Sequence, residues 1–180
     1  MKINKDAFSS GQVGSKLWLC KQLELTDLYS HETAIYGGWY GMTAFLLLSR
    51  GKFNVETVRS YDIDPTCEAV ADMINEYWVW QKWRFKAFTE DCNSIITSAD
   101  LIINTSTEHF SSSAWWDNIP KGTAVALQGN NMQHDDHVSN TRSLEEFCSQ
   151  FPVTQELYRG ALDFEYPDWK FTRYMLIGVK

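Results

Sequence analysis

A glycine-rich turn between two apolar segments is the feature that most constrains how this chain can fold. Residues 34–41 read AIYGGWYG, and the apolar run from Met42 to Leu48 follows directly. The first three residues are typical of the end of a buried strand, and the glycines allow a sharp turn and a close approach of the backbone to a ligand. Residues 43–48 continue as a helix whose N-terminal N–H groups point back at the turn. We therefore predict a strand, turn and helix with a ligand site at the turn.

A second predicted strand ends in acidic residues about 25 residues after the first glycine. Residues 58–65 read VRSYDIDP. A carboxylate at the end of this strand can accept hydrogen bonds from both hydroxyls of a ribose whose remainder lies over the glycine turn. Asp62 is the first candidate for this contact, and Asp64 is the alternative.

The rest of the chain alternates between helical and extended patterns. Residues 1–12 carry little pattern and predict a loose arm, and residues 13–28 have the apolar spacing of a helix that packs on the sheet or covers the ligand. After the acidic strand we expect, in order, a helix at 65–80, strands at 83–88, 101–103 and 123–127, a helix at 143–151 capped by Ser143, and two antiparallel strands at 153–162 and 171–179.

Composition narrows the class of protein. A chain of 180 residues with 44% hydrophobic residues fits one globular domain, and no apolar run approaches the roughly 18 residues that a membrane span needs. The four cysteines are scattered without a C-x-x-C pair, and the start of the chain lacks an apolar signal-peptide core, so we expect reduced thiols and a cytoplasmic protein. The net charge of −7 argues against nucleic acid as a partner.

From about residue 31 to its end, the chain resembles the class I S-adenosylmethionine-dependent methyltransferases. Residues 37–41 (GGWYG) stand where that family has its glycine-rich first motif, and residues 62–65 (DIDP) stand where it has its acidic second motif. The resemblance implies a three-layer α/β Rossmann-like fold with a mostly parallel seven-stranded sheet and an antiparallel last strand, at residues 174–179. It implies one domain over residues 1–180 with an N-terminal helical arm of about 30 residues, and S-adenosylmethionine as the cofactor.

The same resemblance implies which residues contact the cofactor. They lie on the glycine turn, at the acidic strand end, after the third strand and at the end of the fourth: Tyr36, Gly37, Gly38, Gly41, Asp62, Ile63, Asp91, Cys92 and Asn104. For the group after the third strand, a solvated acidic turn is the alternative interpretation. Asn104 could equally be a turn residue that satisfies local backbone groups.

The segments after the fourth and fifth predicted strands are the candidate binding site for the molecule that receives the methyl group. Glu108 and His109 are the predicted catalytic residues, and His109 is the preferred general base because its unperturbed pKa lies near operating pH. Glu108 as a carboxylate at a helix N-terminus is the alternative. Three amides, Gln128, Asn130 and Asn131, are predicted to bind a polar substrate, with loop capping as the alternative.

Residues 134–137 read HDDH and contain side chains that a metal would accept. Because no third ligand follows at a fixed spacing, we expect a solvated loop and no metal.

The function predicted from the sequence is methyl transfer to a small polar molecule or an exposed side chain. The alternatives are an NAD(P)-dependent oxidoreductase and an S-adenosylmethionine-binding protein with other chemistry. The sequence identifies neither the acceptor nor the oligomeric state.

Overall fold

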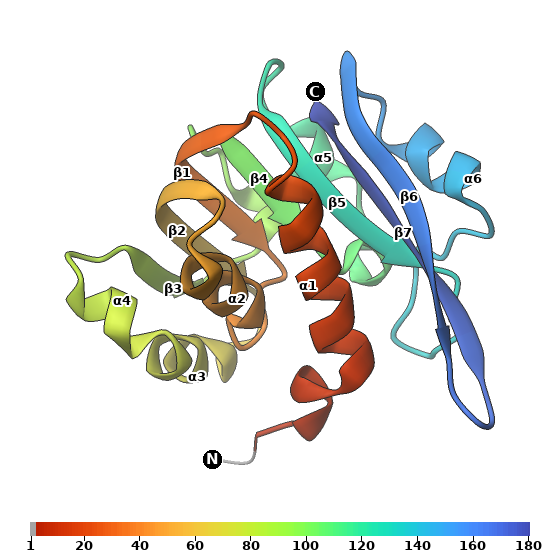
Figure 1. Cartoon of the computed structure of the whole chain (residues 1–180), viewed down its shortest axis with the longest axis horizontal. Helices are drawn as coiled ribbons and strands as arrows, with labels where there is room; N and C mark the ends of the chain where they lie inside the picture. The colour runs from red at the N-terminus through yellow and green to blue at the C-terminus, as the bar shows by residue number, and fades with distance from the viewer. Residues whose placement is uncertain (1–2) are drawn as a thin grey trace.

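The fold is built on one seven-stranded sheet with helices on both faces (Figure 1). The computed structural model describes residues 3–180. The strands are β1 (Tyr29–Tyr36), β2 (Asn54–Asp62), β3 (Phe85–Thr89), β4 (Leu101–Asn104), β5 (Ala124–Asn130), β6 (Gln155–Glu165) and β7 (Lys170–Val179). The helices are α1 (Ser10–Leu23), α2 (Met42–Arg50), α3 (Cys67–Ile74), α4 (Glu76–Trp80), α5 (Ala114–Asp117) and α6 (Leu144–Gln150), with short 3-10 helices η1 (Lys5–Phe8), η2 (Cys92–Ser94) and η3 (Thr107–His109).

The strand order is β3-β2-β1-β4-β5-β7-β6, and strands β1 to β5 pair in parallel. β7 lies between β5 and β6 and runs antiparallel to both. These pairings confirm the predicted fold class and the antiparallel last strand. From β1 the chain proceeds to β2 and β3 on one side and later to β4 and β5 on the other. Ligands in open α/β sheets bind at such a reversal, beyond the carboxyl ends of the strands.

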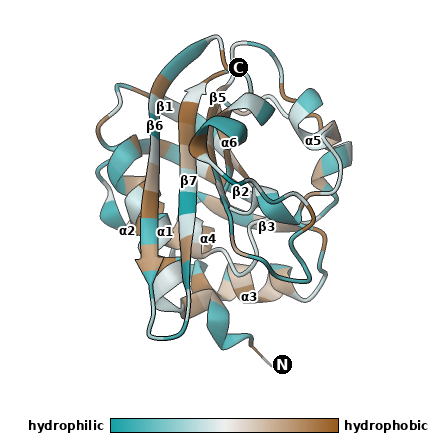
Figure 2. Ribbon diagram, turned by 90° about the vertical axis from the view of Figure 1, so that its right-hand side faces the viewer, coloured by the Kyte–Doolittle hydropathy of each residue, from teal (hydrophilic) through white to brown (hydrophobic). Residues whose placement is uncertain are grey.

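Each face of the sheet packs against its own helices. Ile35 and Ile103 lie in one core cluster with residues of α1, α2 and α3. Their strand neighbours Ala34 and Ile102 lie in a second cluster with residues of α5 and α6. Successive side chains of a strand point to opposite faces, so burial on both faces explains the continuous apolar runs in the sequence. β6 and β7 also contain hydrophobic segments (Figure 2).

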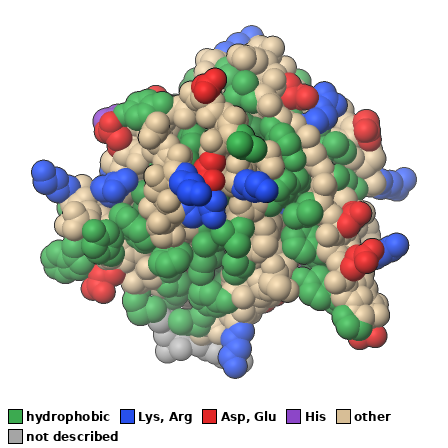
Figure 3. All heavy atoms as spheres, viewed as in Figure 1, with side chains coloured by type: hydrophobic (Ala, Val, Ile, Leu, Met, Phe, Trp, Pro, Cys, Tyr) green, Lys and Arg blue, Asp and Glu red, His purple; other side chains and the backbone are tan. Residues whose placement is uncertain are grey.

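The outer surface of the α1 and α2 layer is partly charged and partly apolar (Figure 3). Arg50 at the end of α2 pairs with Glu24 just after α1, with Nε and Oε1 2.5 Å apart. Three aromatic side chains stay exposed around α4, where hydrophobic atoms gather at the lower left of Figure 3: Tyr77, Trp80 and Trp83. None of the helices within residues 3–180 combines the length and the apolar character that crossing a membrane requires.

Three predicted boundaries are wrong for physical reasons. The arm is not loose over its described part, because η1 buries Ala7 and α1 begins at Ser10. The helix expected at 65–80 breaks at Asn75, whose side chain donates to the carbonyls of Gly41 and Ala71. β5 continues through Asn130 because each residue from 124 to 130 pairs with β7. The Ser143 cap is confirmed, since its Oγ accepts from the Glu146 N–H at 3.1 Å.

Candidate active site

One cavity of about 640 Å³ opens at the carboxyl ends of β1, β2 and β4. Its walls come from four regions: the N-terminal segment with α1, the glycine turn, the segments after β2, β3 and β4, and the loop after β5. The lining side chains are Asn4, Asp6, Ala7, Gln12, Lys16, Gly37, Gly38, Trp39, Tyr40, Met42, Asp62, Ile63, Asp91, Cys92, Asn93, Thr105, Ser106, Glu108, His109, Phe110, Ser111, Met132, His134, Asp136 and His137.

The glycine turn forms part of the cavity wall and is packed tightly against the protein behind it. Gly37 and Gly41 have φ of +62° and +70°, and Trp39 between them has φ of +48°, an uncommon value for a residue with a Cβ. A Cβ added at Gly38 would lie 1.9 Å from Ser60 Oγ. Gly41 does not line the cavity, and a Cβ there would lie 2.6 Å from Asn75 Nδ2. At these two positions a Cβ would clash with side chains packed inside the protein, so glycine is required by packing.

The acid at the end of β2 is joined to the glycine turn. One carboxylate oxygen of Asp62 accepts the Trp39 N–H at 2.7 Å, and the other accepts the Asp64 N–H at 3.0 Å. Burial raises the pKa of Asp62, and these two N–H groups oppose the rise. Asp64 accepts from the Thr66 N–H at 2.9 Å and does not line the cavity. The structure therefore separates the two acids, because Asp62 and Ile63 line the cavity and Asp64 does not.

The segment after β3 reaches the same cavity. Asp91 accepts hydrogen bonds from both the backbone N–H and the side-chain amide of Asn93, each at 2.9 Å. Burial raises the pKa of Cys92 to about 12. Because a thiol with this pKa stays protonated near neutral pH, Cys92 contributes a small apolar wall and not a nucleophile.

Two of the residues predicted to bind the cofactor lie behind the cavity wall and do not line it. Tyr36 is buried against Tyr61 and Trp115 in the core. Asn104 is also buried, and its Oδ1 accepts the Ser106 N–H at 3.0 Å. Neither residue lines the cavity, whereas Ser106 does. Asn104 thus supports the wall from inside.

Glu108 places a buried carboxylate at the cavity. Its side chain is 3% exposed, and Oε1 accepts from Asn130 Nδ2 and lies 3.6 Å from Arg173 Nη1. Arg173 is equally buried and donates to the Thr105 carbonyl at 3.1 Å. Burial lowers the pKa of Arg173, and the Glu108 charge opposes that effect. The second oxygen, Oε2, is buried and has no hydrogen-bond partner among the described residues.

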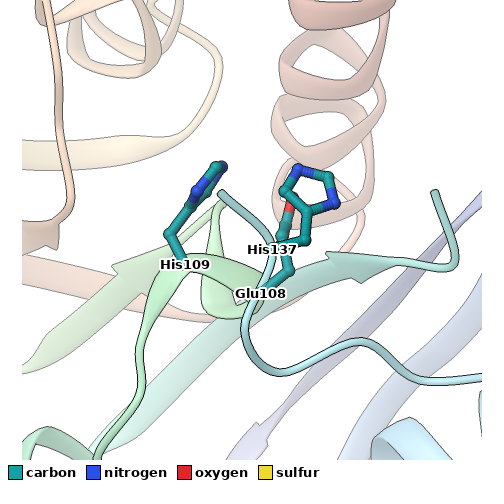
Figure 4. A group of neighbouring side chains, drawn as sticks. All are labelled: Glu108, His109 and His137. Carbon is teal, nitrogen blue, oxygen red and sulfur yellow. The ribbon is translucent and has the colours of Figure 1, made fainter. Parts of the chain in front are cut away.

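Two imidazoles stand beside this carboxylate. The rings of His109 and His137 have centroids 4.8 Å apart and are nearly perpendicular at 88° (Figure 4). His109 Nδ1 lies 3.0 Å from the Asp136 carbonyl, and His137 Nδ1 lies 2.8 Å from the Met132 carbonyl. Since a carbonyl can only accept, both Nδ1 atoms carry the proton. The lone pair of each neutral ring is therefore on Nε2.

Lys16 is the functional candidate that the sequence interpretation missed. It lines the cavity from α1 at 7% exposure, and its Nζ donates to Gln12 Oε1 at 2.6 Å. Burial, reinforced by the charge of Arg173, lowers the pKa of Lys16 to about 7, although Glu108 acts in the opposite direction. A signal existed in the sequence, because Lys16 precedes Leu19 and Leu23 at the three- and seven-residue spacing of one helix face.

The three amides predicted to bind substrate are engaged within the protein. Gln128 donates to the Ser15 carbonyl of α1 at 2.9 Å, Asn130 donates to Glu108, and Asn131 accepts the Thr172 N–H at 2.8 Å. None of the three lines the cavity. The reason is the longer β5, which places the first two inside the sheet and leaves Met132 and the histidine loop to reach the cavity.

Solved structures of methyltransferases share this architecture. The chain matches the N-methyltransferase NodS from Bradyrhizobium japonicum WM9 with a TM-score of 0.67 and 12% identity, over 93% of this chain and 96% of that one. It matches magnesium protoporphyrin IX methyltransferase (ChlM) from Synechocystis PCC 6803 with bound SAM, with a TM-score of 0.68 and 10% identity, over 99% of this chain and 86% of that one. No protein-family model and no curated protein matches the sequence.

At such low identity the likeness concerns the fold. The chain has the Rossmann-like fold of the class I S-adenosylmethionine-dependent methyltransferases, as the resemblance in the sequence implied.

Proposed function

We propose that this protein transfers a methyl group from S-adenosylmethionine to a small polar acceptor. The observation that carries the proposal is a single cavity that contains the glycine turn, the Asp62 carboxylate and the Glu108–His109 segment. The residues proposed for the cofactor and the acid–base groups therefore line the same cavity. It opens where the strand order of the sheet reverses, which is where this type of fold binds ligands. The methyltransferase fold of the chain supports the same conclusion.

The residues present fit the cofactor. A cavity of about 640 Å³ lies within the range of roughly 300–1,000 Å³ that is usual for small-molecule sites. In this proposal Asp62 accepts the ribose hydroxyls, and the backbone of Gly37 and Gly38 lies beneath the sugar. Ile63 and the segment 91–93 surround the base, because they line the cavity from β2 and β3.

The other part of the cavity is assigned to the acceptor. When bound, S-adenosylmethionine supplies a methyl group already activated on a sulfonium, so the protein has chiefly to align the acceptor and accept a proton if one is lost. His109 offers a free Nε2 lone pair, and Glu108 offers an unpartnered oxygen. Lys16 and Asp136 line the same region. Their polarity supports a polar acceptor.

A nucleotide-dependent oxidoreductase is the alternative that shares the glycine turn and the ribose acid. Differential scanning fluorimetry with S-adenosylhomocysteine, NAD and NADP, followed by calorimetry, separates the two. We expect S-adenosylhomocysteine alone to stabilise the protein. At 100 times its Kd the gain is about 2.7 kcal/mol, which corresponds to a Tm increase of roughly 5–10 °C for a domain of this size. Stabilisation by NAD or NADP without any effect of S-adenosylhomocysteine would refute the proposal.

A further inference from the structure

Three metal-ligating side chains meet at the acceptor end of the cavity. Glu108, His109 and His137 each place one donor atom within 4.8 Å of the others (Figure 4). Two of them are consecutive on η3, and the third comes from the loop after β5, 28 positions further along the chain. This set did not emerge from the sequence because its third member is brought in only by the fold.

Both histidines are already held in the form that a metal requires. Ligating histidines usually donate the second ring N–H to a carbonyl or carboxylate, which fixes the tautomer and the ring orientation. Here the carbonyls of Asp136 and Met132 accept from the two Nδ1 atoms and leave each Nε2 free. The loop after β5 thus supplies the His137 ligand and also the two carbonyls that orient the imidazoles.

The carboxylate gives an independent indication. Glu108 Oε1 is engaged by Asn130 and Arg173, whereas Oε2 is buried without a partner among the described residues. An unpaired oxygen of a buried carboxylate costs free energy. A cation bound between this oxygen and the two imidazoles would remove that cost.

The lining of the cavity is acidic, although Arg173 behind Glu108 carries a positive charge. Within residues 3–180, five carboxylate side chains line the cavity against one lysine, Lys16. The carboxylates belong to Asp6, Asp62, Asp91, Glu108 and Asp136. Such a cavity concentrates cations.

We propose that Glu108, His109 and His137 bind one divalent transition-metal ion of the Zn²⁺, Mn²⁺ or Co²⁺ type. Two imidazoles with one carboxylate suit these ions better than Mg²⁺ or Ca²⁺, which prefer oxygen ligands throughout. Donors at about 2.0–2.2 Å from such an ion lie roughly 3–3.5 Å apart, whereas the donor atoms here lie within 4.8 Å of one another, so the most widely separated pair would close by up to about 1.3–1.8 Å on binding. His109 is exposed, and His137 is half-buried in the loop after β5.

Three protein ligands leave coordination positions open, as in catalytic metal sites. This part of the inference rests on the proposed methyl transfer: the open position would take an oxygen of the acceptor. Because coordination lowers the pKa of a hydroxyl, the acceptor would lose its proton to solvent. Its oxygen would then form a bond to the methyl carbon while the methyl carbon–sulfur bond breaks and S-adenosylhomocysteine leaves with the electron pair. In this arrangement Glu108 and His109 would act on the acceptor through the ion.

The test measures metal binding without any cofactor. Protein freed of metal with EDTA is titrated by calorimetry with Zn²⁺, Mn²⁺ and Co²⁺ separately, and Co²⁺ binding is also followed by its visible absorption. We expect one ion per chain. His109→Ala and His137→Ala should each weaken binding by about 100-fold or more, since loss of an outer partner alone costs 10- to 100-fold. The matched control is His31→Ala, which removes an exposed imidazole outside the cavity and should leave the affinity unchanged.

Wild-type protein that binds none of the three ions, or binding that survives both histidine substitutions, would overturn the metal site. Glu108→Gln is not used, because it would leave Arg173 buried without its charge partner and could unfold the protein. The test therefore uses the two histidine variants, whose side chains are less buried. S-adenosylhomocysteine binding is measured separately in EDTA. Metal binding without S-adenosylhomocysteine binding would retain the metal site and reject its role in methyl transfer.

Discussion

Replacing Lys16 with methionine should stabilise the protein at low pH. Burial lowers the pKa of Lys16 from its ordinary value of 10.5 to about 7. Each pKa unit corresponds to about 1.4 kcal/mol, so keeping this amine protonated in the folded state costs roughly 5 kcal/mol as an upper limit. Methionine preserves most of the side-chain volume but loses the bond to Gln12, a charged hydrogen bond of about 1.5–3 kcal/mol. We expect a net gain of about 1–3 kcal/mol at pH 6.

The pH dependence gives the sharper test. The unfolded chain keeps the Lys16 proton up to pH 10.5, whereas the folded chain releases it at about 7. Between these values the unfolded state binds more protons, so the stability of the wild type rises with pH relative to the methionine variant. The advantage of Lys16→Met should be complete below pH 7 and should shrink steadily toward pH 10.5.

Urea unfolding in EDTA, at intervals from pH 6 to pH 10, measures this difference. Lys21→Met is the matched control, because Lys21 is exposed on the same helix, and its effect should stay within about 0.5 kcal/mol. If Lys16→Met is destabilising at pH 6, or if its effect does not change with pH, the burial cost assigned to Lys16 is wrong.

Three further predictions concern the cavity and its wall. Asp62→Ala should weaken S-adenosylhomocysteine binding by about 1.5–3 kcal/mol, measured by calorimetry, whereas Asp64→Ala, outside the cavity, should change the affinity little; equal losses in both would remove the ribose assignment. Gly41→Ala should lower the free energy of unfolding by more than Gly51→Ala, because both glycines have positive φ but only the Gly41 Cβ meets a neighbour, at 2.6 Å; thermal unfolding with equal losses would contradict this. Once an acceptor is known, His109→Ala should lower kcat by about 10²-fold or more with nearly unchanged S-adenosylhomocysteine affinity, and wild-type kcat would reduce His109 to a structural role.

The sequence by itself determined the part of the site that we propose for the cofactor, because its signals are local. The glycines at 37 and 41 mark a turn through their own backbone freedom, and Asp62 stands at the end of the second strand, about 25 residues after the first glycine. The two β-rich runs at the end predicted the antiparallel pair in the same way. The Ser143 cap depends on a residue only three positions away. Contacts over such short separations leave a pattern that can be read from one sequence.

The tertiary structure alone decided the part of the site that we propose for the acceptor, because its contacts join distant segments. β5 extends through Asn130 only because β7 pairs with it, and this pairing turned three predicted substrate amides into internal contacts. Lys16 reaches the cavity because α1 packs beside the sheet. His137 joins Glu108 and His109 because the carboxyl ends of β4 and β5 are neighbours. These contacts cannot be predicted from residue spacing within a single segment, because each depends on which strands are neighbours in the sheet.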